Sequence, residues 1–273
     1  MNNKKNKIDS AKELKLRVSV GVLVKVLFTN PATGQITLAL ERIATLRKIN
    51  GSSKVDVTVK PFGGGVRITD PQELKKLIDD FQYDSEKSKE EKDFRILIYQ
   101  EMWGKIKEIC NDQWHGKGKR IFDYSPDREL AEEFEDSLNV KLKSDEYRLI
   151  PKSMIVQNLP SRTNNIRAQG RPTVRVYYIF EAWIKSYELI KLMMTKSKEY
   201  SENDFKKAAL KHAELGGKGR ANSIMIIGID ELRDKFNSIP LKERSGNINF
   251  NEFKLEENVL ALFSEVKSLN YDF

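Results

Sequence analysis

The chain has 273 residues, of which 39% are hydrophobic and 32% are charged, so it carries enough apolar side chains for a buried core. Its single cysteine, Cys110, excludes an internal disulfide, and with His115 and His212 as the only histidines a structural zinc cluster is excluded too. The net charge of +8 indicates anionic partners such as nucleotides, nucleic acid or a membrane surface.

The N-terminal half of the sequence alternates between strand patterns and helical patterns. Residues 1–15 are polar and lysine-rich, which predicts a basic tail rather than a secretory signal, and no apolar run reaches the ~18 residues of a membrane span. We therefore expect a cytoplasmic protein with one structured domain over 16–273. The predicted elements, in order, are strands over 16–28, 36–41 and 55–62, a helix over 71–81, a charged stretch over 84–93 and a helix that includes Ile96, Ile98, Met102, Ile106 and Ile109.

The C-terminal half continues the same alternation. Ser125 and Pro126, followed by acidic residues, are typical of a helix start. The predicted elements, in order, are a helix over 125–138, strands over 147–157 and 174–183 joined by a polar loop over 161–170, one or two helices over 185–212, a strand over 223–229 followed by a helix, and a final helix over 256–268. Strands interspersed with helices predict an α+β fold, a layered α/β/α sandwich with a mixed sheet.

Residues 128–133 read R-E-L-A-E-E and are the most informative segment of the chain. On a helix, Glu129, Glu132 and Glu133 are spaced i, i+3 and i+4, so their side chains share one face. A hard cation such as Mg²⁺ or Mn²⁺ would offset the repulsion between these carboxylates, since such ions take oxygen ligands and bridge carboxylates to substrate phosphates. A solvated acidic helix face without a ligand is the alternative that these residues leave open.

Three consecutive glycines, Gly63, Gly64 and Gly65, stand at the end of a predicted strand. They allow the backbone to approach a ligand or another element closely, although a plain tight turn would use them equally well. Together with the acidic segment they resemble the Nudix box, G-x5-E-x7-R-E-U-x-E-E-x-G-U, in which U is apolar. Residues 128–133 match R-E-U-x-E-E in full, and residues 61–66 resemble the glycine-rich stretch that opens the box.

The resemblance covers about residues 16–240, but the box itself is interrupted. Counting five residues on from Gly64 reaches Asp70, an acid where the family has glutamate, whereas counting back from Arg128 reaches Arg120. The closing glycine of the box is replaced by Glu135. We interpret the residues between the two halves of the box as a helical insertion over about 71–118, and we expect a second insertion over 185–215.

Nudix hydrolases cleave a diphosphate linked to another moiety, usually in a nucleotide, so the resemblance implies a metal-dependent hydrolase. It implies Glu129, Glu132 and Glu133 as ligands of Mg²⁺ or Mn²⁺, with one of them also acting as the base. Arg128 would orient Glu129 by a charge-assisted bond. The further candidates for the substrate or phosphate site, which are glycines, the acid of the box and basic residues near loops and strands, are Gly63, Gly64, Gly65, Asp70, Lys117, Lys119, Arg120, Arg171 and Arg175.

Two other functions remain open. A non-catalytic Nudix-like sensor of a nucleotide or second messenger, in bacterial signalling or defence, fits the interrupted box. A nucleic-acid-binding module fits the charge of +8, but the basic tail explains part of that charge, so a nucleotide-type small molecule is the favoured ligand. A homodimer is an expectation by analogy, because many members of the family are dimers. Cys110 is expected to be a buried inert thiol, and His115 and His212 are expected to lie at the surface.

Overall fold

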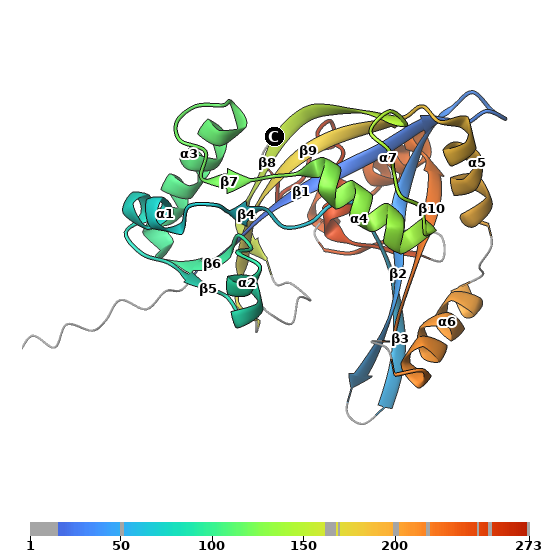
Figure 1. Cartoon of the computed structure of the whole chain (residues 1–273), viewed down its shortest axis with the longest axis horizontal. Coiled ribbons are helices and arrows are strands. Elements are labelled where there is room, and N and C mark those ends of the chain that lie inside the picture. The colour runs from blue at the N-terminus through green and yellow to red at the C-terminus, as the bar shows by residue number, and fades with distance from the viewer. Residues whose placement is uncertain are drawn as a thin grey trace, which may run out of the picture.

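The computed structural model describes residues 16–49, 52–161, 168, 170–198, 202–216, 219–244, 246–250 and 253–271 (Figure 1). The predicted basic tail over 1–15 and most of the predicted loop over 161–170 lie outside these ranges. Within them, none of the helices combines the length and the apolar character that crossing a membrane requires.

A mixed sheet of ten strands forms the centre of the molecule (Figure 1). Its longest strands are β1 (Leu16–Thr29), β2 (Ile36–Ile49), β8 (Tyr147–Ser161) and β9 (Thr173–Ile184). The shorter strands are β3 (Ser52–Lys60), β5 (Gln82–Tyr83), β6 (Arg95–Ile98), β10 (Arg220–Gly228), β11 (Ile248–Phe250) and β12 (Phe253–Leu255). A separate two-stranded sheet pairs β4 (Arg67–Ile68) with β7 (Phe122–Asp123).

Strand β1 pairs with other segments of the sheet along both of its edges. One edge of β1 pairs in parallel with β9, which in turn pairs antiparallel with β8. Along its other edge, β1 pairs first with β6, then with the glycine-rich turn after β3, and finally with β2. In the middle section, Val22 N donates to Gly64 O at 2.9 Å and Val24 N donates to Phe62 O at 2.8 Å. The glycine turn is therefore held in the sheet between two strands that are distant in sequence.

Both faces of the sheet are covered, which makes the three-layer arrangement that the sequence predicts. Alternate residues of β1 enter two separate cores, with Val20 and Val22 on one face and Leu23 and Leu27 on the other. The near-continuous burial of β1 is typical of a strand with a parallel neighbour and cover on both faces. The mixed α+β architecture is thus confirmed.

The helices divide between these two faces. The first core includes side chains from α1 (Pro71–Ile78), α3 (Trp103–Trp114), α4 (Pro126–Leu138) and α5 (Tyr187–Lys196). The second core includes α7 (Ile229–Ser238) and α8 (Glu257–Leu260), while α6 (Glu202–Glu214) packs against β2, β3 and β10 (Figure 1). The short helix α2 (Glu86–Glu90) and the 3₁₀ turns Gln100–Met102 and Leu241–Glu243 complete the set of described helices.

Two predicted elements are wrong. The helix predicted through Ile96 and Ile98 begins only at Trp103, because residues 95–98 form β6 and pair with β1. β-branched side chains two residues apart favour a strand once a partner edge is present. The predicted insertion over 71–118 therefore contains strands β5 and β6 as well as helices.

The final helix predicted over 256–268 is reduced to the single turn α8. The apolar side chains beyond it still reach the second core, with Phe263 and Val266 almost fully buried. The chain buries these side chains in turns rather than in a helix, so tertiary packing overrides the helical pattern of the sequence.

Candidate functional site

The acidic helix α4 is fixed against the glycine turn by its apolar face. The helix starts with Pro126 in its first turn, as the sequence predicts. Leu130 and Phe134 are fully buried, and the Phe134 ring lies 5.1 Å from the ring of Phe62, the residue before Gly63. This aromatic contact brings the two halves of the interrupted motif together, although residues 67–127 separate them in the sequence.

The first two glycines of the turn have specific steric reasons to be glycine. Gly63 has φ +136°, and a Cβ there would overlap the Val22 carbonyl. A Cβ at Gly64 would overlap the carboxylate of Glu129. The missing side chains therefore allow both strand β1 and the acidic helix to approach this turn closely.

Glu133 binds the turn directly. Its carboxylate accepts a hydrogen bond from the Gly63 N–H, and its Oε1 lies 2.6 Å from Lys60 Nζ. The same ammonium lies 2.6 Å from Oε2 of Glu41, whose side chain is fully buried. Burial raises the pKa of Glu133 against the opposing charge of Lys60. Burial also opposes protonation of Lys60, but the carboxylates of Glu133 and Glu41 together raise the pKa of that ammonium. A buried Glu41–Lys60–Glu133 chain thus links β2, β3 and α4.

Arg128 holds the other two glutamates. Its guanidinium pairs with Glu129 and lies 3.1 Å from Glu132. The Glu129 side chain is 11% exposed, whereas that of Glu132 is 59% exposed. Burial raises the pKa of Glu129, and the charge of Arg128 partly offsets this rise. Arg128 therefore has the orienting contact to Glu129 that the sequence resemblance implies.

The donor chemistry of the three glutamates fits a divalent cation, because carboxylate oxygens are the ligands that Mg²⁺ and Mn²⁺ take. Their arrangement, however, is set by the protein's own cations, since Arg128 pairs with Glu129 and Glu132 and Lys60 pairs with Glu133. Among the described residues, no three Asp, Glu, His or Cys side chains are assembled as ligands for an ion. A metal at this position would therefore have to displace the cationic side chains from the carboxylates.

A cavity of about 710 Å³ opens beside the glycine turn. Small-molecule sites commonly have volumes of roughly 300–1,000 Å³. Gly63, Gly64 and Lys60 line the cavity and also contact the acidic helix, whereas Glu129 and Glu133 are not part of its wall. The charged residues of the wall are Arg17, Arg47, Lys60, Arg95, Arg175 and Lys254, with Asp56, Glu256 and Glu257 as the acids. The excess of basic groups favours an anionic ligand.

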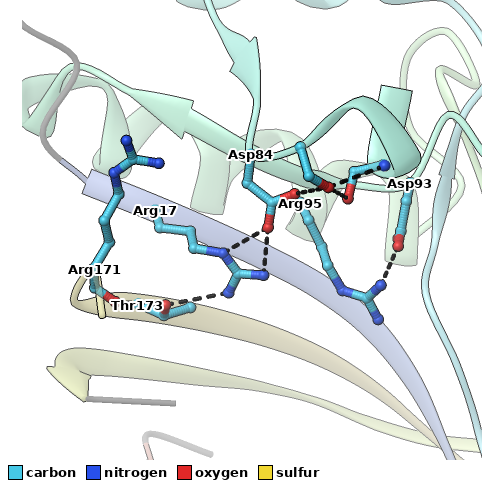
Figure 2. A network of polar contacts seen from close by, with 8 residues as sticks. Arg17, Asp84, Asp93, Arg95, Arg171 and Thr173 are labelled. Atoms are coloured by element: carbon cyan, nitrogen blue, oxygen red, sulfur yellow. Dashed lines mark hydrogen bonds and ion pairs between the residues drawn. The ribbon is translucent and has the colours of Figure 1, made fainter. Parts of the chain in front are cut away.

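The motif-based prediction missed the wall arginines Arg17, Arg47 and Arg95, of which Arg17 and Arg95 are drawn in Figure 2. Arg17 Nε donates to Asp84 Oδ2 at 2.8 Å, and Nη1 donates to the Thr173 hydroxyl at 3.2 Å. Arg95 pairs with Asp93. Each of these two arginines belongs to a strand of otherwise mostly apolar residues. A charge in such a strand needs an ionic partner or a ligand, so this position in the sequence could have identified both residues as candidates.

The predicted phosphate ligands divide between the cavity and other places. Arg175 is buried and lines the cavity. Arg171 does not line it, and its side chain points away from the Arg17 guanidinium (Figure 2). Gly65 lies beside the cavity-lining glycines, next to the carboxylate of Asp93.

The structure does not bring Asp70 and the basic loop before the acidic helix to the cavity. Asp70 caps helix α1, accepts a hydrogen bond from the Glu73 N–H at 3.0 Å and lies 2.6 Å from Lys119 Nζ. Arg120 pairs with Asp123 at 3.2 Å, and Lys117 is exposed. None of the contacts of Asp70 reaches α4, because the side chain is used as a helix cap. The first acid of the box therefore has no counterpart beside the glutamates at this position.

The predicted surface positions of the two histidines and the predicted burial of the cysteine are confirmed. His115 and His212 are exposed, and Cys110 is fully buried. Burial raises the pKa of the Cys110 thiol to about 12, which disfavours the reactive thiolate in the folded protein.

The chain matches no protein-family model and no curated protein sequence. Its function is therefore inferred from the geometry of the acidic helix, the glycine turn and the basic cavity.

Proposed function

We propose that this protein is a Nudix-type, metal-dependent hydrolase that cleaves a diphosphate linkage in a nucleotide or nucleoside-diphosphate derivative. The supporting observation is the contact between two parts of the interrupted motif. Glu133 binds the Gly63 N–H and Glu129 lies against Gly64, where the turn lines a basic cavity. The glycine turn thereby contacts both the carboxylates of the acidic helix and the basic cavity.

In this proposal, Glu129, Glu132 and Glu133 hold the divalent cation. A bound Mg²⁺ or Mn²⁺ would neutralise diphosphate oxygens and activate water for attack on phosphorus. Arg128 keeps Glu129 oriented through its charge-assisted contact. Gly63 and Gly64 line the cavity, so a phosphate group bound there would lie against the backbone of the turn.

Lys60 has two roles in the same proposal. It lines the cavity, and it neutralises the buried Glu41 together with Glu133. If a divalent cation bound Glu133, the Lys60 ammonium would stay paired with Glu41 and would present positive charge to the diphosphate. A single buried thiol is consistent with a reducing compartment, and we propose a cytoplasmic location.

The test is a substrate panel of nucleotide sugars, dinucleotides, ADP-ribose, nucleoside triphosphates and cyclic oligonucleotides, incubated with Mg²⁺ or with EDTA. Chromatography should show Mg²⁺-dependent cleavage of at least one substrate. Glu132→Gln and Glu133→Gln should reduce turnover on the order of 100-fold or more. Glu135→Gln is the matched control, because it removes the same charge from an exposed position of the same helix. Wild-type turnover in both test variants would refute the site.

A non-catalytic nucleotide sensor is the second candidate, and the ion pairs of the acidic helix favour it. Lys60 and Arg128 already form ion pairs with the three glutamates, as expected of a protein that never binds metal. This function predicts tight binding of a nucleotide without turnover, measured by calorimetry in the presence of Mg²⁺. Rapid hydrolysis of the same ligand would exclude it.

A further inference from the structure

The register of the sheet places two arginines on either side of one small residue. Ser19 of β1 lies opposite Arg95 of β6 on one edge and opposite Arg175 of β9 on the other. Residues paired across neighbouring strands point to the same face of a sheet. All three residues accordingly line the same cavity.

Arg175 differs from Arg17, the other buried arginine of the cavity, because its partners are neutral. Its side chain is buried, and Nη1 donates to Ser161 Oγ at 2.7 Å, to Gln157 Oε1 and to the Thr173 carbonyl. Among the described residues, no carboxylate forms an ion pair with it. The closest acid along this chain of contacts, Glu257, accepts from Gln157 Nε2 at 3.1 Å, so an amide separates the two charges.

The neighbouring cations show what Arg175 lacks. Arg17 lies 2.7 Å from Asp84, Arg47 lies 3.4 Å from Asp56, and Arg95 pairs with Asp93. Arg95 Nη1 donates to Asp93 Oδ2 (Figure 2). The Arg95 side chain is 24% exposed. A buried charge is ordinarily compensated by an opposite charge. A negatively charged ligand could supply the compensating charge for Arg175.

The pair of arginines also lies at a useful distance from the glycine turn. Gly21 of β1 lies opposite Gly65 of the turn, and Ser19 is two residues away along the same strand. Two residues of an extended strand span about 7 Å. One ligand can therefore contact the glycine turn and the two arginines together.

We propose that Arg175 and Arg95 form a second phosphate subsite, so that the preferred ligand carries a phosphate in addition to the diphosphate beside the glycine turn. Guanidinium groups recognise phosphate through two parallel N–H donors, which suits this pair. The inference rests on the proposed function for the position of the diphosphate. It specifies the ligand class: nucleoside triphosphates and dinucleotides with an additional phosphate bind better than nucleotides with a neutral group at that place.

The experiment is isothermal titration calorimetry in EDTA with pairs of ligands that differ by one phosphate, namely ADP with ATP and NAD with NADP. For at least one pair, the wild type should bind the more phosphorylated member about tenfold more tightly. Arg175→Gln and Arg95→Gln should each reduce this preference to threefold or less. Arg171→Gln is the matched control, since it removes the same charge from a side chain that does not line the cavity, and it should leave the preference unchanged.

Arg95 keeps the test decisive if the Arg175 variant does not fold, because the Arg95 side chain is partly exposed; thermal unfolding of both variants is recorded first. The absence of a preference in the wild type for either pair overturns the subsite, as does an unchanged preference in folded Arg95→Gln. The two proposals fail in different ways. A preference that depends on Arg95, in a protein that hydrolyses nothing with Mg²⁺, refutes the hydrolase and keeps the subsite. Hydrolysis that depends on Glu133, in a protein without a preference for the more phosphorylated ligand, refutes the subsite and keeps the hydrolase.

Discussion

Replacing Asp84 by asparagine tests how strongly the buried ion pair with Arg17 stabilises the wall of the cavity. The two side chains are 2% and 0% exposed, with Arg17 Nη2 lying 2.7 Å from Asp84 Oδ2. Asparagine has nearly the same shape and keeps an acceptor for the Ser85 hydroxyl, which now donates to Asp84 at 3.0 Å. The substitution thus removes the charge and leaves a buried guanidinium uncompensated.

The expected loss follows from this burial. Removing one partner of a buried pair lowers the free energy of unfolding by about 3–5 kcal/mol. For a chain of this size each kcal/mol lowers Tm by about 2–4 °C, so Asp84→Asn should lower Tm by roughly 6–20 °C. The double variant Arg17→Met with Asp84→Leu should recover most of the loss, because it removes both charges and fills the space with apolar atoms.

Urea unfolding and calorimetric melting measure this loss. Glu108→Gln is the control: the Lys105–Glu108 pair, at 3.2 Å, is exposed on both sides, and its loss should change the free energy of unfolding by less than about 1 kcal/mol. If Asp84→Asn is as mild as Glu108→Gln, or if the double variant is no more stable than Asp84→Asn, the reasoning about the buried pair is wrong.

Three further predictions concern the turn, the thiol and a cavity carboxylate. Gly64→Ala should reduce any Mg²⁺-dependent turnover on the order of 100-fold while the protein stays folded, since the new Cβ would displace the Glu129 carboxylate; unchanged kinetics would show that this contact is dispensable. Cys110 should resist alkylation by iodoacetamide in the native protein at pH 8 and react after unfolding, because burial raises its pKa to about 12, and rapid native labelling would contradict its burial. Burial raises the pKa of Glu256, so the charged form of this carboxyl destabilises the fold above the ordinary glutamate pKa, and the effect vanishes below it. Glu256→Gln should therefore raise Tm at pH 8 and leave Tm unchanged at pH 4. An equal change in Tm at both pH values would refute this linkage.

Local patterns were sufficient for most of the fold. The acidic helix runs from Pro126 to Leu138, as its proline start and apolar spacing predict. Valine-rich β1 and the strand over 173–184 were also predictable, because runs of β-branched residues flanked by turns favour strands. The paired contact of the acidic helix with the glycine turn was expected only from the motif resemblance, since no local pattern relates segments so far apart.

The sequence-based predictions were wrong where tertiary packing, rather than the local sequence, determines the structure. Residues 95–98 form a strand because they pair with the edge of β1. This pairing joins segments that are distant in the sequence, so the local spacing of apolar residues could not predict it. The cavity arginines Arg17 and Arg95 were missed for a similar reason. Their acidic partners, Asp84 and Asp93, lie in a charged stretch that has no recognisable motif. Only the pairing of β5 and β6 with β1 brings Asp84 to Arg17, whereas Asp93 is two residues from Arg95 in the chain.

We propose that Glu129, Glu132 and Glu133 form a divalent-cation site beside the glycine turn. The most direct measurement is Mn²⁺ titration followed by the electron paramagnetic resonance signal of the free ion, in the wild type, Glu133→Gln and the control Glu135→Gln. We predict that the wild type and Glu135→Gln bind Mn²⁺ with equal affinity and that Glu133→Gln weakens binding by about tenfold or more. No Mn²⁺ binding by the wild type, or equal binding by all three proteins, would contradict the account.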